Sequence, residues 1–578
     1  MGNHGPTGPY TPDVPATFAA AESWDAVVVG SGPGGLTAAA CLAATGHRVL
    51  VLERHDLAGG NAQVFRRHHD DAEFEFDVGV HYLGDCGPGG LFPSIFAALG
   101  VGDRIRFRPL DPDGFDTLRF PDLELAVPAG WEAYRDRLIA AFPTERAGIE
   151  RCLDVLRQVA DESRARLLPG AQTPTFDEWA FRPLADLFDA CELTPRSRAV
   201  LDHWSGLYAG PPSTTAIAMH AAIIDHYMRG AYYPEGGGQV IPARLTQVIE
   251  ANRGEIRTLT PVERIVVEEG RVRGVRLAGD HVVAAPIVIS NADHSRTVLE
   301  LVGREHWEPA TVRWVEHATM TVGLVCVYVV VDIDLTDRPN TNYFVFPSYD
   351  VERLYERLDS GVLDLDDLFA YIAIASRKDP GNAHLCPPGH TNFQIMTLAP
   401  RGYGFWGIER GPAEGGRYRR DETYRERKTQ LTERLLDLAE EVLGPFRDHI
   451  VHLETATPIT HERYTHSTGG TSYGYLHSPD QSGTNRPHHR TEIEGLWLVG
   501  AGTTEGHGIA GTMVGGVNCA GEILGRPLLV EMMMGTRLVE PESLPPDPDD
   551  FDPVEQCRGR ALRERRAEGR RARARAGS

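Results

Sequence analysis

The sequence predicts an α/β protein with a Rossmann-like nucleotide-binding domain and a discontinuous second domain of mixed sheet and helices. Three observations near the N-terminus support this prediction. Val27–Val29 is a β-branched run typical of a buried strand, and Gly30-Ser-Gly-Pro-Gly-Gly35 joins it to an alanine-rich helical stretch. A second apolar run, Arg48–Leu52, ends in Glu53, 23 positions after Gly30. This order of strand, glycine turn, helix, strand and acid is typical of a dinucleotide-binding sheet.

Each residue type in the glycine motif meets a requirement of phosphate binding. Gly30 permits the tight turn, Gly32 leaves bare backbone beneath a pyrophosphate, and Gly35 lets the helix pack closely on the strand. The unpaired N–H groups and the dipole at the helix start favour negative charge. Glu53 lies where a carboxylate accepts hydrogen bonds from an adenosine ribose, which disfavours a 2′-phosphate. The alternative is a glycine turn in an unrelated α/β protein.

Composition excludes several classes of function. The 578 residues, 42% of them hydrophobic, suit two to four domains. A net charge of −23 argues against a nucleic-acid partner, because phosphate binding needs a cationic face. The eight cysteines include no Cys-x-x-Cys pair, so we expect reduced thiols rather than disulfides or zinc ligands. Three histidine-rich spots lack ligand spacing, so we interpret them as surface residues and expect no metal: His68-His69, His461 with His466, and His488-His489.

The two ends of the chain are polar. Residues 1–23 lack the cationic start and apolar run of a secretory signal, and we expect a disordered leader. The longest apolar stretch, Met320–Val331, is too short to cross a bilayer and suits an interior strand. The acidic, proline-rich residues 540–555 give way to nine arginines from Arg558 to Arg575. We expect a solvated disordered tail, with attraction to an anionic membrane or to the acidic body as alternatives, and a cytoplasmic protein with peripheral contact at the inner membrane surface.

Patterns along the chain indicate two interleaved domains. Helical periods broken by prolines fill residues 131–230, and alternating β-branched residues fill 256–290 with Glu269-Gly270 as a hairpin turn. The strand, glycine loop and helix of 496–516 return the chain to the nucleotide, so the cofactor is a large one. The predicted segments are a leader at 1–23, a nucleotide-binding domain at 24–110, 231–300 and 489–528, a mainly helical cap at 111–230, a sheet-bearing substrate domain at 301–488, and a disordered acidic then Arg-rich tail at 529–578.

Four motifs in this order resemble the phytoene desaturase family of flavoproteins, which includes carotenoid isomerases and retinol saturases and belongs with the flavin amine oxidases. The resemblance covers about residues 24–525. Members of the family that desaturate usually carry prolines where this chain has Glu505 and Ala510, so we expect a different loop geometry there. The motifs are Glu75-Phe-Asp-Val-Gly-Val-His-Tyr82, Tyr233-Pro-Glu-Gly-Gly, Ser290-Asn-Ala-Asp293 and Gly500-Ala-Gly-Thr-Thr-Glu-Gly-His-Gly-Ile-Ala-Gly511.

The resemblance implies non-covalent FAD in a GR2-type flavoprotein fold. It places Glu53 on the adenosine ribose, Gly59-Gly60 along the ribityl side and the backbone of Val262 at the adenine. Independently, Ile509–Thr512 begin a helix after a glycine loop, so their N–H groups can stabilise negative charge on reduced flavin. The full set of expected cofactor residues is Gly30, Gly32, Pro33, Gly34, Gly35, Glu53, Arg54, Gly59, Gly60, Asn61, Val262, Asn291, Gly500, Gly502, Ile509, Ala510, Gly511 and Thr512.

Three residues are candidates for catalysis. His81 and Tyr82 follow a strand expected to approach the flavin ring, where a proton donor is useful and an unperturbed imidazole pKa of about 6.5 suits cellular pH; the alternative is a packed, hydrogen-bonded pair. Tyr473 can wall an apolar tunnel or fill a core. Ser472 matches the hydrolase pattern Gly-x-Ser-x-Gly but lacks the strand-to-helix context, so no hydrolase is expected. Glu505, inside the flavin loop, either perturbs the cofactor charge or points to solvent.

These features favour an FAD-dependent oxidoreductase acting on carbon–carbon double bonds of a lipophilic isoprenoid or polyene of carotenoid or retinoid type. The resemblance leaves desaturation, saturation and isomerisation open and slightly favours saturation. A single dinucleotide fingerprint indicates that electrons pass to or from a transient carrier such as NAD(P)H, a quinone or oxygen. The alternatives are an amine oxidase-like flavoprotein acting on a polar amine, and a flavin-stabilised scaffold or lipid carrier without activity.

Overall fold

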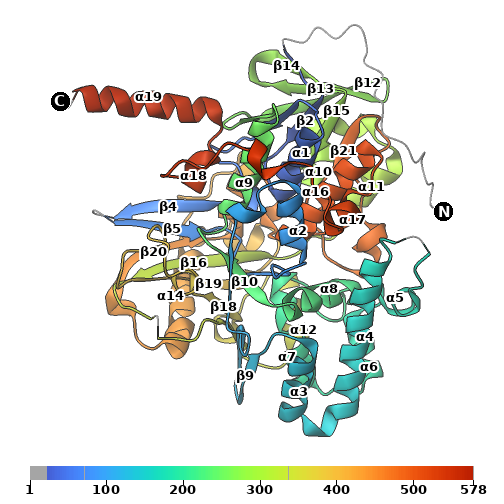
Figure 1. Cartoon of the computed structure of the whole chain (residues 1–578). Helices are drawn as coiled ribbons and strands as arrows, with labels where there is room; N and C mark the ends of the chain where they lie inside the picture. The colour runs from blue at the N-terminus through green and yellow to red at the C-terminus, as the bar shows by residue number, and fades with distance from the viewer. Residues whose placement is uncertain (1–21, 70–71, 169, 336, 577–578) are drawn as a thin grey trace.

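A five-stranded parallel sheet forms the centre of the nucleotide-binding domain. The computed structural model describes residues 22–69, 72–168, 170–335 and 337–576 (Figure 1). The strands are ordered β11 (Glu255–Arg257), β3 (Val49–Leu52), β2 (Ala26–Val29), β15 (Ile287–Ser290) and β21 (Leu496–Leu498). The three central strands are rich in Val, Ile and Leu and fully buried, as expected for a parallel sheet covered on both faces. Helix α1 (Pro33–Ala44) packs against α9 (Val240–Ala251) and α16 (Gly508–Leu524). The predicted Rossmann-like fold is confirmed.

A smaller sheet lies beside this one. It is ordered β1 (Glu22–Ser23), β14 (His281–Ala284), β13 (Arg271–Leu277) and β12 (Val262–Glu268). The predicted hairpin turn at Glu269-Gly270 is confirmed, and both residues have positive φ. Glu22–Ser23 were predicted as part of a disordered leader, but they pair with Val283–Ala284; residues 1–21 of that prediction lie outside the described residues.

A seven-stranded sheet forms the second domain. Its order is β20 (Ile450–Ala456), β16 (Gly323–Val331), β19 (Thr391–Ala399), β18 (Ala370–Ala373), β17 (Asn342–Val345), β8 (Asp116–Phe120) and β9 (Leu123–Val127). The predicted strand within Met320–Val331 is β16. Strands β8 and β9 lie in the segment 111–230, predicted to be mainly helical; they join the sheet because β8 pairs in parallel with β17.

Helices cover both faces of the seven-stranded sheet. Helix α14 (Glu422–Leu443) packs on one face. The other face meets the cap, seen below and to the right in Figure 1, which consists of α3 (Trp131–Ala141), α4 (Arg146–Ala165), α5 (Pro174–Trp179), α6 (Leu184–Ala190), α7 (Pro195–Leu201) and α8 (Ile217–Met228). The hairpin of β4 (Val64–His69) and β5 (Ala72–Asp77) runs between the domains, and its following loop enters the central cavity described below.

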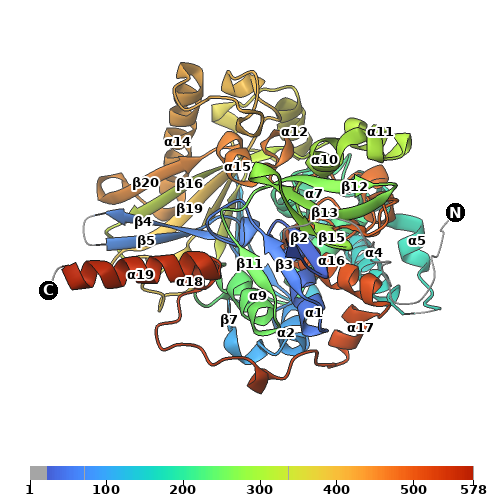
Figure 2. The same ribbon diagram turned by 90° about the horizontal axis from the view of Figure 1, so that it is seen from above.

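The C-terminal segment folds back over the nucleotide-binding domain. It contains α17 (Leu528–Met533), α18 (Pro553–Gln556) and α19 (Arg560–Ala576), so the prediction that 529–578 is disordered is wrong for residues 529–576. The acidic stretch is ordered because its carboxylates pair with arginines of the body: Asp552 accepts two 2.8 Å hydrogen bonds from Arg66, and Asp547 accepts from Arg244 at 2.8 Å. Figure 1 and Figure 2 show α19 projecting from the same side of the molecule as the β4–β5 hairpin, and Figure 1 shows that the helix lies well above the hairpin. Within the described ranges, no helix has the length and hydropathy needed to cross a bilayer.

Candidate functional site

One continuous cavity of about 1200 Å³ lies between the two domains. This volume exceeds the range typical of a single small-ligand pocket, roughly 300–1,000 Å³. Its nucleotide arm lies at the carboxyl ends of β2 and β3, the position at which doubly wound sheets bind ligands. Its apolar arm reaches between the seven-stranded sheet and the cap, and is lined by Gly206, Leu207, Leu324, Cys326, Phe344, Phe369, Tyr371 and Met396, with His81, Tyr328 and Tyr473.

The nucleotide arm contains a cradle that only glycine fits. Helix α1 begins after Gly32 without a side-chain cap or an acid in its first turn, so its leading N–H groups are available to a ligand's phosphates. A Cβ added at Gly60 would lie 2.8 Å from the Cα of Gly32. Gly35 does not line the cavity; a Cβ there would lie 2.5 Å from the Gly30 carbonyl, so this glycine serves strand-to-helix packing. These features fit a pyrophosphate group.

Glu53 is fixed at the rim of the cradle. One carboxylate oxygen accepts hydrogen bonds from the backbone N–H and the hydroxyl of Ser31, at 3.0 and 2.6 Å, and the other accepts from the N–H of His55 at 2.8 Å. The residue is buried but still lines the cavity. Arg54 and Val262, predicted at the adenosine end, line the same arm. The carboxylate is therefore held in one orientation for a ribose.

A second uncapped helix start faces the other end of this arm. His507 precedes α16 without capping it through its side chain, and Gly508, Ile509 and Thr512 line the cavity. The predicted Ala510 and Gly511 do not line it, because their positions on the first turn face away. The free N–H groups of this turn suit the negative charge of a reduced flavin.

The remaining predicted cofactor residues are likewise of two kinds: those that line the cavity and one that does not. Those that line the cavity are Gly30, Gly32, Pro33, Gly34, Gly60, Asn61, Asn291, Gly500 and Gly502. Gly59 does not; its N–H donates to the Ser31 hydroxyl at 3.2 Å, so it shapes the turn. Its φ of 137° explains the glycine.

His507 and His477 form a buried pair that the sequence patterns did not indicate. The Nε2 of His507 lies 2.9 Å from the Leu207 carbonyl, which can only accept, so the proton of His507 is on Nε2. Its Nδ1 then accepts from Nε2 of His477, 2.8 Å away. Burial lowers the pKa of His507 to about 4, so the imidazole is neutral. It packs on the Tyr473 ring at 4.7 Å.

The structure separates the three candidate catalytic residues. His81 and Tyr473 line the apolar arm, and the Tyr473 hydroxyl donates to the Gly206 carbonyl at 3.2 Å. Tyr82 does not line it: its hydroxyl donates to Asp116 at 3.1 Å. Burial and the nearby Lys378 ammonium lower the pKa of His81 to about 3, which corrects the unperturbed value expected from sequence. His81 therefore faces the cavity as a neutral imidazole.

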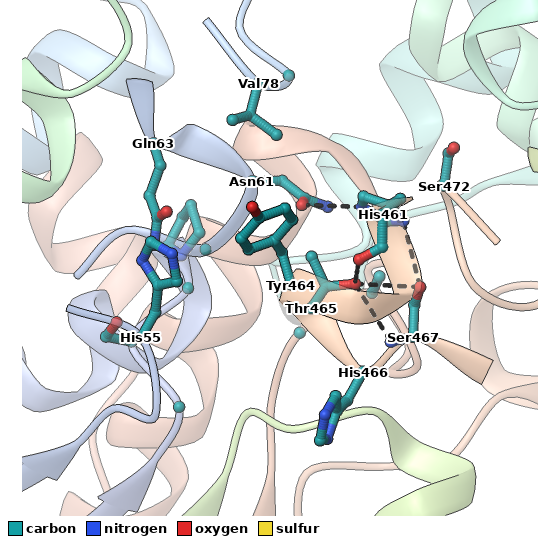
Figure 3. A pocket seen from close by; sticks show the side chains of 18 of the residues that line it. His55, Asn61, Gln63, Val78, His461, Tyr464, Thr465, His466, Ser467 and Ser472 are labelled. Atoms are coloured by element: carbon teal, nitrogen blue, oxygen red, sulfur yellow. Dashed lines mark hydrogen bonds between the residues drawn. The ribbon is translucent and has the colours of Figure 1, made fainter. Parts of the chain in front are cut away.

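Three histidines predicted at the surface lie inside, and His466, at the end of α15 (Pro458–Thr465), lines the cavity. His461, on the same helix, also lines the cavity, with Nε2 3.1 Å from the side-chain oxygen of Asn61 and Nδ1 3.2 Å from the Ser467 hydroxyl (Figure 3). His489 is buried beside Glu505. Among the described residues, no group of three His, Cys, Asp or Glu side chains is arranged to hold a metal ion. Ser472 follows the 3₁₀ turn at Thr468–Gly470 and so has no nucleophile elbow.

A cavity with a glycine cradle, a buried acid at its rim and a second uncapped helix start defines a flavin-dependent oxidoreductase fold. The chain belongs to the flavin containing amine oxidoreductase family, which matches residues 33–524. Its cofactor is FAD, and the predicted resemblance is confirmed.

Relatives and solved structures agree with this assignment. The chain is 28% identical to all-trans-retinol 13,14-reductase of Danio rerio over 88% of this chain and 87% of that protein, and 27% identical to the Homo sapiens protein of the same name over 88% and 87%. It is 27% identical to prolycopene isomerase 2 of an Oncidium hybrid cultivar over 86% and 84%. An oxidoreductase from Methanosarcina mazei has a TM-score of 0.58 at 18% sequence identity, and the match covers 85% of this chain and 99% of that one. Cyclohexylamine oxidase from Brevibacterium oxydans has a TM-score of 0.53 at 15% sequence identity, and the match covers 86% of this chain and 99% of that one. These structures share the fold.

Proposed function

We propose that this chain acts on carbon–carbon double bonds of a lipophilic isoprenoid or polyene of retinoid or carotenoid type, with saturation favoured over desaturation and isomerisation. The apolar arm that opens from the flavin site is the observation on which this proposal rests. Similarity to all-trans-retinol 13,14-reductases and prolycopene isomerases supports this substrate class.

The apolar arm contributes position and exclusion of water. Phe344, Phe369 and Met396 wall a channel in which an extended hydrocarbon can lie beside the cofactor. Bound FAD supplies hydride transfer. The neutral imidazole of His81 presents an N–H donor to the substrate, and the first turn of α16 stabilises negative charge at the other side of the cavity.

An amine substrate is the second candidate, because amine oxidases share the fold. An ammonium group needs a carboxylate or an aromatic cage to replace its hydration. The apolar arm is lined mainly by aromatic and aliphatic residues, and the nearby carboxylate of Glu454, opposite Tyr328, is already paired with Arg67 at 2.7 Å. This composition favours the polyene.

The arginine-rich end of the chain lies at the rim of the cavity, where Arg558 and Arg566 are among the lining residues. We propose that α19 attracts an anionic lipid surface from which a lipophilic substrate enters. Electrons then come from or go to a diffusible carrier: NAD(P)H, a quinone or oxygen.

Anaerobic flavin spectroscopy tests the proposed reaction. Protein with chemically reduced FAD is mixed with all-trans-retinol or a cis-carotenoid, and oxidised protein is mixed with an amine. We expect the polyene to restore the oxidised flavin spectrum and to yield a product two hydrogens heavier by mass spectrometry. Bleaching of oxidised FAD by the amine alone would establish the second candidate.

A further inference from the structure

The chain has only two lysines, and one is buried behind the wall of the cavity. Lys378 ends the short helix α13 (Ala375–Lys378) and is 2% exposed. Its ammonium donates to the His81 carbonyl at 2.6 Å and to the side-chain oxygen of Asn342 at 2.5 Å. Both acceptors are uncharged. A buried cation without a directly bonded carboxylate is energetically costly, so its position needs an explanation.

The lysine belongs to a closed ring of hydrogen bonds. The Asn342 amide donates to one oxygen of Asp116 at 2.8 Å, and the Tyr82 hydroxyl donates to the other at 3.1 Å. Because His81 and Tyr82 are consecutive, Lys378 fixes the backbone of one while Asp116 fixes the side chain of the other. The ring therefore determines which way His81 faces.

Two neutral amides hold the preceding residues of the same wall. Asn392 donates to the Glu75 carbonyl at 2.8 Å, and Gln394 donates to the Asp77 carbonyl at 3.1 Å. Both come from β19 of the seven-stranded sheet. Lys378 provides the third anchor, and an ammonium makes a stronger hydrogen bond to a carbonyl than an amide does.

We propose that Lys378 is a positioning residue: its ammonium holds the His81 backbone against the cavity. His81 then meets the substrate as an N–H donor in a single orientation. The effect on turnover rests on the proposed function. The effect on the titration of Lys378 does not.

The surroundings of Lys378 make this device sensitive to pH. The titratable groups that face it are Asp77 on β5, Asp116 on β8, His81, Tyr82, and Tyr233 on β10 (Ala231–Pro234). Burial lowers the pKa of Lys378 to about 7 against the opposing charges of Asp116 and Asp77, and burial raises the pKa of each carboxyl to about 7. These groups titrate as a coupled set near neutrality. Above that pH the anchor loses its charge.

Nuclear magnetic resonance of protein labelled with ¹³Cε-lysine reads this anchor directly, because only two signals exist. Lys428→Met removes one signal and so assigns the other to Lys378. We expect Lys378 to titrate near pH 7 and Lys428 at a higher pH. A Lys378 signal that titrates near the ordinary value of about 10.4 overturns the proposal, whatever the enzyme acts on.

Turnover by two variants tests the role in positioning. Lys378→Met should keep FAD but lower kcat at least tenfold, with a smaller change in KM. The fall in activity that the wild type shows as pH rises past neutrality should disappear in this variant. The control variant Lys428→Met should match the wild type. Asp116→Asn keeps the lysine and serves as the test if Lys378→Met fails to fold. Loss of the Asp116 charge should lower the pKa of Lys378, so the alkaline fall in activity and the titration of the Lys378 signal should move together to lower pH. An alkaline fall that persists without Lys378, or that moves apart from the lysine signal, contradicts the proposal.

Discussion

Glu505 and His489 form a buried ion pair whose atoms Oε2 and Nε2 are 3.0 Å apart. Neither residue lines the cavity, and the Glu505 carboxylate faces His489 rather than pointing to solvent, which was one of the two alternatives considered from sequence. Its other oxygen accepts a hydrogen bond from Asn518 of α16 at 2.8 Å. The pair therefore fastens the flavin loop to the helix that follows it.

Loss of this pair should lower stability in a defined pH window. Burial alone would lower the pKa of His489, but Glu505 raises this pKa above its usual value. The contribution of protonated His489 to folding stability is therefore complete below about pH 6.5 and is lost as pH rises through the raised pKa. Burial alone would raise the pKa of Glu505, but His489 lowers it, so its contribution is lost as pH falls below about 4.3. His489→Gln should cost about 1–3 kcal/mol between these values.

Thermal unfolding from pH 4 to pH 9 measures this effect. The adjacent, exposed His488 supplies the control variant His488→Gln, which should follow the wild type. Equal Tm losses by the His489 variant at pH 5.5 and pH 9 would show that the pair is not the cause.

Glu53→Gln should weaken FAD binding by about 1–3 kcal/mol, because a charged acceptor for the ribose becomes neutral. Titration of apoprotein with FAD, followed by flavin fluorescence, gives the affinity. Glu263→Gln, an exposed position on β12, is the matched control. Wild-type affinity in the Glu53 variant would remove this residue from the site. Acid precipitation should release FAD into the supernatant, as expected for a non-covalent cofactor.

Gly60→Ala should reduce FAD content at least tenfold. A methyl group there meets the Gly32 backbone, and φ is 55°, so the phosphate cradle must distort. Gly46 also has a positive φ, but a Cβ added there would meet no atom within 4 Å. Gly46→Ala therefore shows the effect of backbone strain without a steric contact. We expect Gly46→Ala to lose about 1 kcal/mol of stability and to keep its FAD. Equal FAD loss in both variants would point to strain alone.

The lipid-binding role of α19 is tested in the full-length chain, because truncation removes structural contacts as well. Arg570, Arg571, Arg573 and Arg575 are changed together to Gln. Co-sedimentation with anionic vesicles should fall, because each arginine removed weakens the binding free energy by about 1 kcal/mol at low salt. The difference from the wild type should fade at high salt. Four exposed arginines of the body changed to Gln provide the control: Arg410, Arg417, Arg420 and Arg425. Identical losses in the two variants would indicate an effect of net charge only.

His81→Gln should keep FAD and slow substrate turnover at least tenfold, within the range of about 10²- to 10⁴-fold typical of lost general acid–base help. Because the pKa of His81 is about 3, its own titration should add no step to the rate between pH 5 and 8 beyond the alkaline fall expected from Lys378. His317→Gln, at an exposed position outside the cavity, serves as control. Unchanged turnover with full FAD occupancy would reduce His81 to packing.

Local patterns predicted the nucleotide arm well. The Gly30–Gly35 motif, Glu53 and the start of α16 depend on consecutive residues, so period and turn chemistry suffice to place them. Three features could not be predicted because they depend on contacts across the chain. Tyr82 turns to Asp116, and His507 meets His477. The acidic stretch is ordered by ion pairs of Asp552 with Arg66 and of Asp547 with Arg244, and both arginines lie more than 300 residues earlier in the sequence.

The interleaving of the two domains has a consequence for biosynthesis. Strand β21 and helix α16 complete the FAD-binding sheet and cradle, yet they follow β2 and α1 of the same domain by more than 450 residues. Ribosomes deliver the N-terminal half first. The nascent polypeptide therefore cannot complete its FAD site until residues 496–524 have been synthesised.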